Sequence, residues 1–298
     1  MDRWIGPVRW MAWASLAGVV ALYVQAETTR LGPPAGVVAY PDIVYRHAPD
    51  GRRPRLDLYV PAAGQAPSLR RPAVVAIHGG GWRGGTKNTY GREVARLARL
   101  GYVVASVEYV LSEPGRPTWP DNLDDVREAV RWVRVHAGEY GIDPGRIAAL
   151  GSSAGGHLAE LLGTQAQGEE PASRVQAVVN LYGPSDLAGL FRSPGAVMPL
   201  RMYLGRDPKD VPDRYRDASP IAHASRRSAP TLIIHGEADM LVPVAQSHAM
   251  AARLNAAGVP SRVIVVPRAG HAFGLNVLGR DLVPEIANFL EAAWPPMG

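Results

Sequence analysis

One pentapeptide of the chain has the pattern that presents a serine side chain as a nucleophile. Residues 151–155 read G-S-S-A-G, which fits G-x-S-x-G with Ser153 at the reactive position. An apolar run at 147–150 precedes the motif and a helix-forming run at 157–162 follows it, as a tight turn from strand to helix requires. Small residues around such a turn leave space for a strained, exposed serine. We predict Ser153 as the nucleophile of an acyl transfer; the alternative is a plain glycine-rich turn.

A serine hydroxyl is a poor nucleophile until a base removes its proton, so the same site needs a histidine and a carboxylate that orients it. Of the eight histidines, His271 lies in a short loop after the last predicted strand. The stretch H-G-E-A-D at 235–239 follows the preceding strand and offers two carboxylates, Glu237 and Asp239. The chain order serine, acid, histidine is the one used by triads built on a strand-to-helix serine turn. We therefore expect His271 to be the general base and one of the two carboxylates to orient it.

A second glycine-rich segment is suited to bind the negative charge that acyl transfer creates. Residues 78–82 read H-G-G-G-W and follow directly on an apolar, strand-like run. Consecutive glycines leave backbone N–H groups open to an anion, and a loop of this type acts together with the residue after a nucleophilic serine. The predicted oxyanion hole therefore consists of Gly80, Gly81 and Ala154. A phosphate-binding loop is the weaker alternative, because neither G-K-[ST] nor G-x-G-x-x-G accompanies these glycines.

Strand-like and helix-like segments alternate along the chain and would position these residues. Continuous apolar runs suit strands buried on both faces of a parallel sheet, and amphipathic segments between them suit crossover helices. The predicted strands span 37–46, 55–60, 72–78, 102–107, 146–150, 175–181, 231–235 and 261–266. The predicted helices span 91–100, 121–140, 154–164, 244–257 and 284–294. The Asp121-Asn122 pair is expected to cap the second helix. We expect one α/β domain over 37–298, with a mostly parallel central sheet and helices on both faces.

The segment 182–228, after the sixth strand, interrupts this alternation. It contains six prolines and a mixture of charged side chains, and it offers only short helices. A connection of this length in a compact domain is a flexible loop or a lid over a site. A lid that encloses long lipid chains presents a broad apolar helix face, which this segment lacks. We therefore expect a water-exposed cover over a modest pocket and a preference for short acyl chains.

The composition narrows the classes of protein to which the chain can belong. Its 298 residues are 47% hydrophobic and 20% charged, which fits a globular fold. The net charge of +5 comes from arginines scattered along the sequence without a dense basic tract, so nucleic acid is not an expected partner. The sequence has no cysteine, which excludes disulfides, thiolate metal sites and a cysteine nucleophile. It also contains no metal-binding or cofactor motif, and the predicted chemistry needs neither a metal nor a cofactor.

The first 26 residues have the features of a secretory signal. Two arginines precede an apolar stretch from Trp10 to Val24, and small residues follow at the position that a signal peptidase reads. We expect export to the periplasm or the cell exterior, with a mature chain that starts near Glu27 and a linker at 27–36. If the signal is not cleaved, residues 5–24 are expected to anchor the protein to a membrane, and a buried N-terminal helix is the third alternative.

Taken together, the motifs resemble those of a known family. H-G-G-G-W, G-S-S-A-G-G-H-L-A, H-G-E-A-D-M-L-V-P and G-H-A-F are similar to motifs of bacterial esterases related to hormone-sensitive lipase and to feruloyl-esterase-like (BD-FAE) enzymes. The resemblance covers residues 40–293 and implies an α/β-hydrolase fold with Asp239 as the triad acid. It further implies a serine carboxylesterase that forms an acyl-enzyme on Ser153. Its partners would be small-molecule esters with short acyl, aromatic or carbohydrate groups.

One part of the family pattern is missing. Many relatives carry Y-R-L-A-P after the fourth strand, whereas this chain reads E-Y-V-L-S-E-P at 108–114. The loss of the arginine leaves the family's substrate-side contacts open for this chain and does not affect the triad. Trp82 and Trp119 are candidates for the walls of the substrate pocket, with ordinary core packing as an equal alternative. An amidase or peptidase would use the same triad. A non-catalytic binding protein is the remaining alternative, but such proteins typically lose a triad member.

Overall fold

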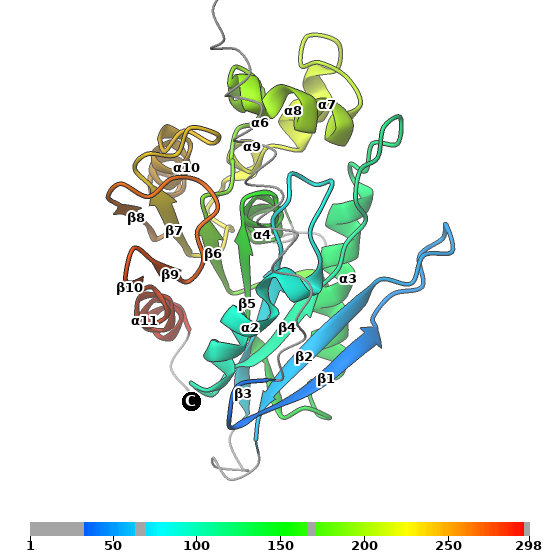
Figure 1. The fold of residues 1–298 in the computed structure, drawn as a ribbon, viewed down its shortest axis with the longest axis vertical. Helices are drawn as coiled ribbons and strands as arrows, with labels where there is room; N and C mark the ends of the chain where they lie inside the picture. Colours follow the sequence, from blue (N-terminus) through cyan, green and yellow to red (C-terminus); the bar gives the residue numbers. More distant parts are fainter. Residues whose placement is uncertain (1–32, 63–69, 166–170, 295–298) are drawn as a thin grey trace, which may run out of the picture. The chain divides into compact units, whose positions relative to one another are not determined.

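An eight-stranded sheet forms the centre of the domain (Figure 1). The structure is a computed structural model that describes residues 33–62, 70–165 and 171–294. The strands are β1 (Val37–Val44), β2 (Arg55–Pro61), β3 (Arg71–Ile77), β4 (Val103–Val107), β5 (Ile142–Ser152), β6 (Ala177–Leu181), β7 (Thr231–Gly236) and β8 (Ser261–Val266). Their order is β1-β2-β4-β3-β5-β6-β7-β8; β2 pairs antiparallel with β1 and β4, and all other neighbours are parallel. The predicted mostly parallel sheet is confirmed, with strand ends that differ by a few residues.

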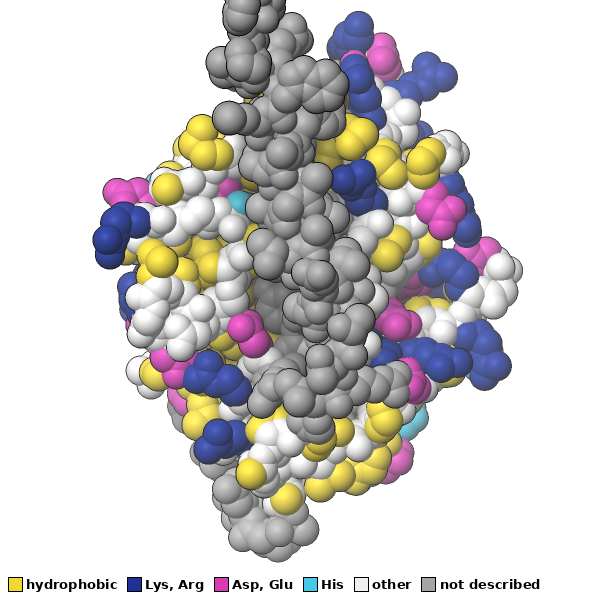
Figure 2. All heavy atoms as spheres, in the orientation of Figure 1, with side chains coloured by type: hydrophobic (Ala, Val, Ile, Leu, Met, Phe, Trp, Pro, Cys, Tyr) yellow, Lys and Arg dark blue, Asp and Glu magenta, His cyan; other side chains and the backbone are white. Residues whose placement is uncertain are grey.

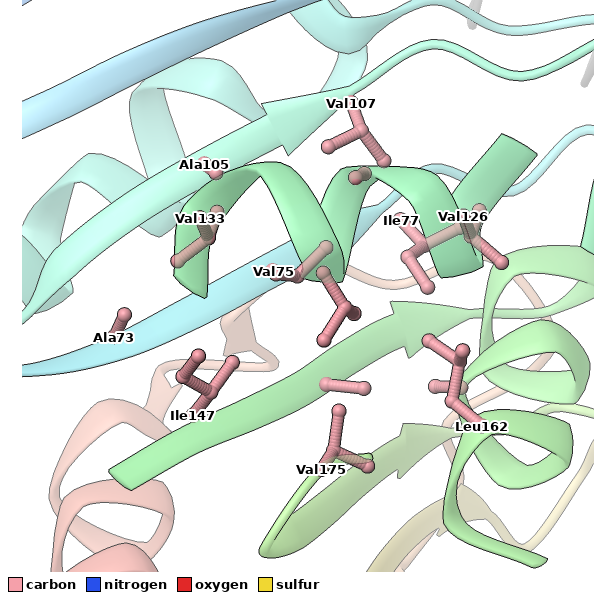
Figure 3. Close-up of a cluster of buried hydrophobic side chains, with 14 of the residues drawn as sticks. Ala73, Val75, Ile77, Ala105, Val107, Val126, Val133, Ile147, Leu162 and Val175 are labelled. Atoms are coloured by element: carbon pink, nitrogen blue, oxygen red, sulfur yellow. The ribbon is translucent and has the colours of Figure 1, made fainter. Parts of the chain in front are cut away.

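Helices cover both faces of this sheet. They are α2 (Lys87–Ala98), α3 (Asp121–Val135), α4 (Ala154–Thr164), α10 (Ala245–Ala256) and α11 (Val283–Ala293). On one face α2 and α11 pack on the strands through buried residues such as Leu97 and Leu290. On the other face α3 and α4 contribute Val126 and Leu162 to a second cluster (Figure 3), and α10 packs beside them on β7. The predicted α/β fold class is confirmed. A short hairpin of β9 (Asn276–Val277) and β10 (Arg280–Asp281) lies outside this sheet.

Helix α3 matches the prediction on its buried face and departs from it at its ends. Three valines recur at helical spacing and are fully buried, as predicted: Val126, Val130 and Val133. The predicted cap is wrong, because Asp121 is the first helical residue and Pro120 stands at the capping position without a side-chain hydrogen bond. Backbone carbonyls of the preceding turn accept hydrogen bonds from the first N–H groups of the helix instead. The side chain of Asn122 does not cap the helix and is buried. The helix also ends at Val135 and gives way to turns before Tyr140.

A buried carboxylate joins α3 to two loops beside the sheet. Asp125 is fully buried and forms ion pairs with Arg46 and Arg52, the latter at 2.7 Å. Its Oδ2 also accepts a hydrogen bond from the backbone N–H of Val110 at 2.9 Å. One side chain therefore holds the connection between β1 and β2, and the segment after β4, against the helix.

Replacing Asp125 with alanine is expected to lower the free energy of unfolding by about 2 to 4 kcal/mol, because it leaves the buried Val110 N–H and two partly buried guanidinium groups without their acceptor. Urea denaturation followed by circular dichroism measures this change. Asp124→Ala is the matched control, since its side chain is 42% exposed and, among the described residues, pairs only with Arg127 on the same helix. That variant should lose at most about 1 kcal/mol. Equal losses in the two variants would contradict a special role of Asp125.

The segment between β6 and β7 is built from short helices. They are α6 (Leu187–Leu190), η4 (Pro194–Ala196), α7 (Val197–Leu204), α8 (Pro212–Asp217) and α9 (Pro220–His223). Three of the six prolines stand at the first positions of helices, where the missing N–H has no intrahelical acceptor to lose. These three prolines therefore start helices in this segment, and the predicted short helices are present.

This insertion has a hydrophobic cluster of its own. Leu200, Tyr203, Leu204 and Tyr215 are almost completely buried together with Trp82 from the main domain. Figure 2 shows Lys and Arg side chains gathered at the end of the domain where α7 and α8 lie. The insertion thus buries its largest side chains, while its charged side chains and Met198 face water.

The predicted signal at 1–26 lies outside the described residues, as does most of the predicted linker at 27–36. Among the residues that the structure describes, no helix combines the length and apolarity that a membrane crossing requires.

Candidate active site

The chain turns sharply at Ser153 between β5 and α4. Ser153 has φ 50° and ψ −119°, a strained backbone conformation for a residue with a side chain, and its N–H donates to the carbonyl oxygen of Leu181 at 2.8 Å. The turn brings α4 close to the end of β3, because a Cβ on Gly155 would lie only 2.1 Å from the carbonyl oxygen of Ile77. Close backbone contacts therefore require a glycine at this position of the motif, and they fix Ser153 at the carboxyl end of the sheet.

Asp239 and His271 approach Ser153 from loops at the same edge of the sheet, after β7 and β8. Oγ of Ser153 lies 2.9 Å from Nε2 of His271, and Nδ1 of His271 lies 2.7 Å from Oδ2 of Asp239. The other candidate carboxylate, Glu237, is exposed and accepts a hydrogen bond from the backbone N–H of Arg268. The three residues form a continuous line of hydrogen bonds in the order serine, histidine, aspartate.

The carboxylate of Asp239 is buried among hydrogen-bond donors. Oδ1 accepts from the backbone N–H groups of Leu241 and Val242, both at 2.9 Å, and Oδ2 lies 3.1 Å from Nε2 of a second histidine, His235. Burial would raise the pKa of this carboxyl, but the hydrogen bonds from the two histidines and from Val242 outweigh burial and hold the pKa well below its ordinary value. Asp239 is therefore an anion at neutral pH, and it keeps the Nδ1 proton on His271.

The glycine loop after β3 lies against the serine turn, since a Cβ on Gly79 would be 3.3 Å from Cβ of Ser153. Gly80 and Gly81 both have positive φ, 122° and 60°, which a side chain would disfavour. Within the described residues, the N–H groups of Gly80, Gly81 and Ala154 donate no hydrogen bond to the chain. These are the three donors predicted for the oxyanion hole; Gly80 is exposed, Gly81 is half-buried and Ala154 is buried.

His78, the first residue of the H-G-G-G-W segment, stabilises the glycine loop through contacts of its ring and of its carbonyl oxygen. Its ring stacks on Tyr109 with 4.3 Å between centroids, and the Tyr109 hydroxyl donates to the His78 carbonyl oxygen at 2.9 Å. Burial lowers the pKa of His78 to about 4 although its ring also bonds to the Gly79 carbonyl, so the ring is neutral at pH 7. Tyr109 belongs to the stretch that departs from the family pattern, and its role in the loop was not anticipated from the sequence.

The two predicted pocket tryptophans lie in the contact between the insertion and the main domain. Trp82 is 3% exposed and stacks on Tyr203, with 4.5 Å between centroids, and its indole N–H donates to Nδ1 of His157 at 3.2 Å. Trp119 is half-buried and meets the edge of Tyr203. His157 in turn donates from Nε2 to the Ala218 carbonyl oxygen at 2.6 Å. The placement of Trp82 is that of core packing, and its partners come from helices that local sequence patterns do not connect.

Among the described residues, no group of three or more His, Cys, Asp or Glu side chains could hold a metal ion.

The ring of Tyr182 lies next to the His271 imidazole and meets it edge-on, with 4.9 Å between centroids. The Tyr182 hydroxyl donates to the Phe273 carbonyl oxygen at 2.6 Å. The site thus places a hydroxyl beside an imidazole, a carboxylate behind the imidazole and backbone N–H groups near the hydroxyl, which are the groups that acyl transfer through a serine uses.

A comparison with models of protein families matches residues 56–254 to BD-FAE. The chain belongs to the BD-FAE family. The resemblance inferred from the motifs is thereby confirmed. The matched region contains Ser153, the glycine loop and Asp239, whereas His271 lies beyond its end.

Known relatives of this BD-FAE chain are esterases by name. It is 34% identical to esterase LipQ of Mycobacterium tuberculosis over 84% of this chain and 61% of LipQ. The chain spans about half to three-fifths of the length of the curated relatives that it matches.

Solved structures of esterases have the same fold. A truncated carbohydrate esterase from gut microbiota is similar with a TM-score of 0.76 and 26% identity, over 88% of this chain and 99% of that one. Esterase 2 of Thermogutta terrifontis, phosphonylated by cyclosarin, is similar with a TM-score of 0.67 and 29% identity, over 87% of this chain and 92% of that one.

Proposed function

We propose that this protein is a serine carboxylesterase in which Ser153, His271 and Asp239 act as the catalytic triad. The observation that carries the proposal is the line of hydrogen bonds from Ser153 Oγ through His271 to Asp239, at 2.9 and 2.7 Å. The names of the relatives favour ester substrates over other acyl compounds.

The first half of the reaction transfers the acyl group to the enzyme. Ser153 Oγ bonds to the acyl carbon of the ester while Nε2 of His271 takes the hydroxyl proton. The carbonyl electrons move onto oxygen, and the N–H groups of Gly80, Gly81 and Ala154 hold that negative charge. When the carbonyl re-forms, the bond to the alcohol oxygen breaks, and His271 gives its proton to the departing alcohol.

The second half returns the enzyme to its initial state. His271 takes a proton from water, the resulting hydroxide oxygen bonds to the acyl carbon, and the same N–H groups hold the second oxyanion. The bond to Ser153 Oγ then breaks, His271 returns the proton to the serine, and the carboxylic acid leaves. Asp239 stays ionised throughout and stabilises the imidazolium in both halves.

An organophosphate tests this proposal directly. Paraoxon is expected to add one diethylphosphoryl group to the full chain, and peptide mass spectrometry should place that group on Ser153. Ser152→Ala is the matched control, because it removes the neighbouring hydroxyl and should be labelled like the wild type. Ser153→Ala should remain unlabelled. Labelling of Ser153→Ala at the wild-type rate would rule out this nucleophile.

We further propose that the acyl groups are short, of about two to six carbons, as a pocket of ordinary small-ligand volume would hold. The inward packing of the apolar side chains of the insertion supports this, because Leu200, Tyr203 and Leu204 are not available to line a long apolar channel. A carbohydrate ester, as in the name of one structural relative, is the substrate class that fits a short acyl group on a polar alcohol.

The value of kcat/KM for p-nitrophenyl esters is therefore expected to be highest between acetate and hexanoate. It should fall at least about tenfold by dodecanoate, because a chain that does not fit must stay in water or displace packed helices. Initial rates below the micelle concentration of each ester measure this. A steady rise to palmitate, or a jump in rate when micelles form, would identify a lipase instead.

A further inference from the structure

A second histidine contacts the triad acid on the side away from the nucleophile. His235, the penultimate residue of β7, is fully buried, and its Nε2 lies 3.1 Å from Oδ2 of Asp239. This is the same oxygen that accepts from Nδ1 of His271 at 2.7 Å. Two imidazoles thus share one carboxylate oxygen, and the reaction described above uses only one of them.

The hydrogen bonds around His235 determine which of its nitrogens carries the proton. Nε2 lies 2.8 Å from the carbonyl oxygen of Val242 as well as 3.1 Å from Asp239, and both partners are acceptors. Nε2 must therefore be the protonated nitrogen. Nδ1 lies 2.6 Å from the hydroxyl of Ser247, which is fully buried on α10 and can donate to it. The two acceptors at Nε2 therefore select the tautomer, in which the Nε2–H is shared between Val242 and Asp239, and Ser247 donates to the unprotonated Nδ1.

We propose that His235, protonated on Nε2 and hydrogen-bonded to Ser247 through Nδ1, is a positioning residue of the triad and limits how strongly Asp239 attracts the Nδ1 proton of His271. The inference rests on the triad role of Asp239 proposed above. A carboxylate oxygen that already accepts one hydrogen bond has less charge to offer a second donor. Without His235, the pair of Asp239 and His271 tightens, and His271 holds its proton to higher pH. With His235 in place, a continuous chain of polar contacts runs through five side chains: Ser247, His235, Asp239, His271 and Ser153.

Other groups also face Asp239 and His271, but among the described residues His235 is the side chain besides His271 that contacts the carboxylate of Asp239. His235 comes from β7, Ser153 from the turn after β5, and Tyr182 from the end of β6. Tyr182 directs its hydroxyl to the Phe273 carbonyl oxygen and not to the imidazole. The remaining donors to Asp239 are the backbone N–H groups of its own loop.

Titration of His271 by NMR in the substrate-free, full-length protein tests the inference without turnover. His235→Phe removes the donor but keeps a ring, and it should raise the titration midpoint of His271 by about 0.5 to 1 pH unit. His235→Gln can place an amide N–H near the position of Nε2 and should restore most of the wild-type midpoint. In an Asp239→Asn background, His235→Phe should leave the midpoint unchanged, because the group that transmits the effect is gone.

The acid limb of the kcat/KM profile on p-nitrophenyl acetate should move by the same amount and in the same direction. If His235→Phe folds, loses stability in urea and keeps the wild-type midpoint, His235 only packs the loop and the inference is wrong. If His235→Phe does not fold, Ser247→Ala decides, since it should give a smaller shift of the same sign, and no shift would overturn the inference. A midpoint that moves in a protein without ester hydrolysis would sink the proposed function and leave this coupling intact.

Discussion

Ser153→Ala is expected to lower kcat on p-nitrophenyl acetate by about three to six orders of magnitude with little change in stability. The alanine keeps the backbone turn but offers no oxygen to the acyl carbon, so only the N–H donors and substrate binding remain to accelerate attack by water. Steady-state rates on enzyme purified free of wild-type protein measure this change, and circular dichroism checks the fold.

Two further variants make that result specific. Ser152→Ala should stay within a few-fold of the wild-type rate, because within the described residues the buried hydroxyl of Ser152 has no hydrogen-bond partner. The double variant Ser153→Ala/His271→Ala should be about as slow as Ser153→Ala alone, since triad members act as a unit. A near-normal rate in Ser153→Ala, or fully multiplied losses in the double variant, would contradict the triad.

Asp239→Asn is expected to lower kcat by about three to four orders of magnitude while the fold is kept. An amide can turn its NH2 group toward Nδ1 of His271, and the proton of the ring then moves to Nε2. In that tautomer Nε2 donates to Ser153 and can no longer take the serine proton. The measurement is kcat at the pH optimum of the wild type, together with the rate of labelling by paraoxon, which should fall in parallel.

The matched control for this variant is Glu237→Gln, which changes the other carboxylate of the same loop. Glu237 is exposed and, in the part of the chain that the structure describes, accepts only from the Arg268 backbone N–H, so its loss should leave kcat almost unchanged. A larger loss in Glu237→Gln than in Asp239→Asn would reverse the assignment of the triad acid.

Much of the fold could be predicted because its strands are buried on both faces. The apolar run of β4, for example, is completely buried, and such runs are visible without knowledge of their neighbours. The serine turn was equally accessible, since the strand before Ser153, the glycines around it and the helix after it are adjacent in sequence. The ends of α3 were not, because the carbonyls that replace a side-chain cap belong to a turn whose geometry depends on tertiary packing.

The parts of the site that could not be predicted depend on contacts between distant segments. Trp82 was assigned to a pocket wall or to the core with equal weight, and the buried partner that decides its placement, Tyr203, lies in the insertion. The same holds for Tyr109, which stacks on His78 from another strand end, and for the hydrogen bond from His235 to the triad acid. The sequence analysis offered Trp82 as a candidate but neither Tyr109 nor His235, because only the folded chain brings these partners together.

The stack of Trp82 on Tyr203 has a consequence for how substrates are admitted. If α7 swung outward, Trp82 would lose its stacking partner and become exposed to water. If α8 moved with it, the carbonyl of Ala218 at the end of α8 would no longer accept the hydrogen bond from His157. His157 lies on the helix that begins directly after the nucleophile, so such a movement would also disturb the serine turn. We therefore expect the insertion to stay in place as substrates enter, so that differences in rate between esters appear without the lag that opening and closing of a cover would impose.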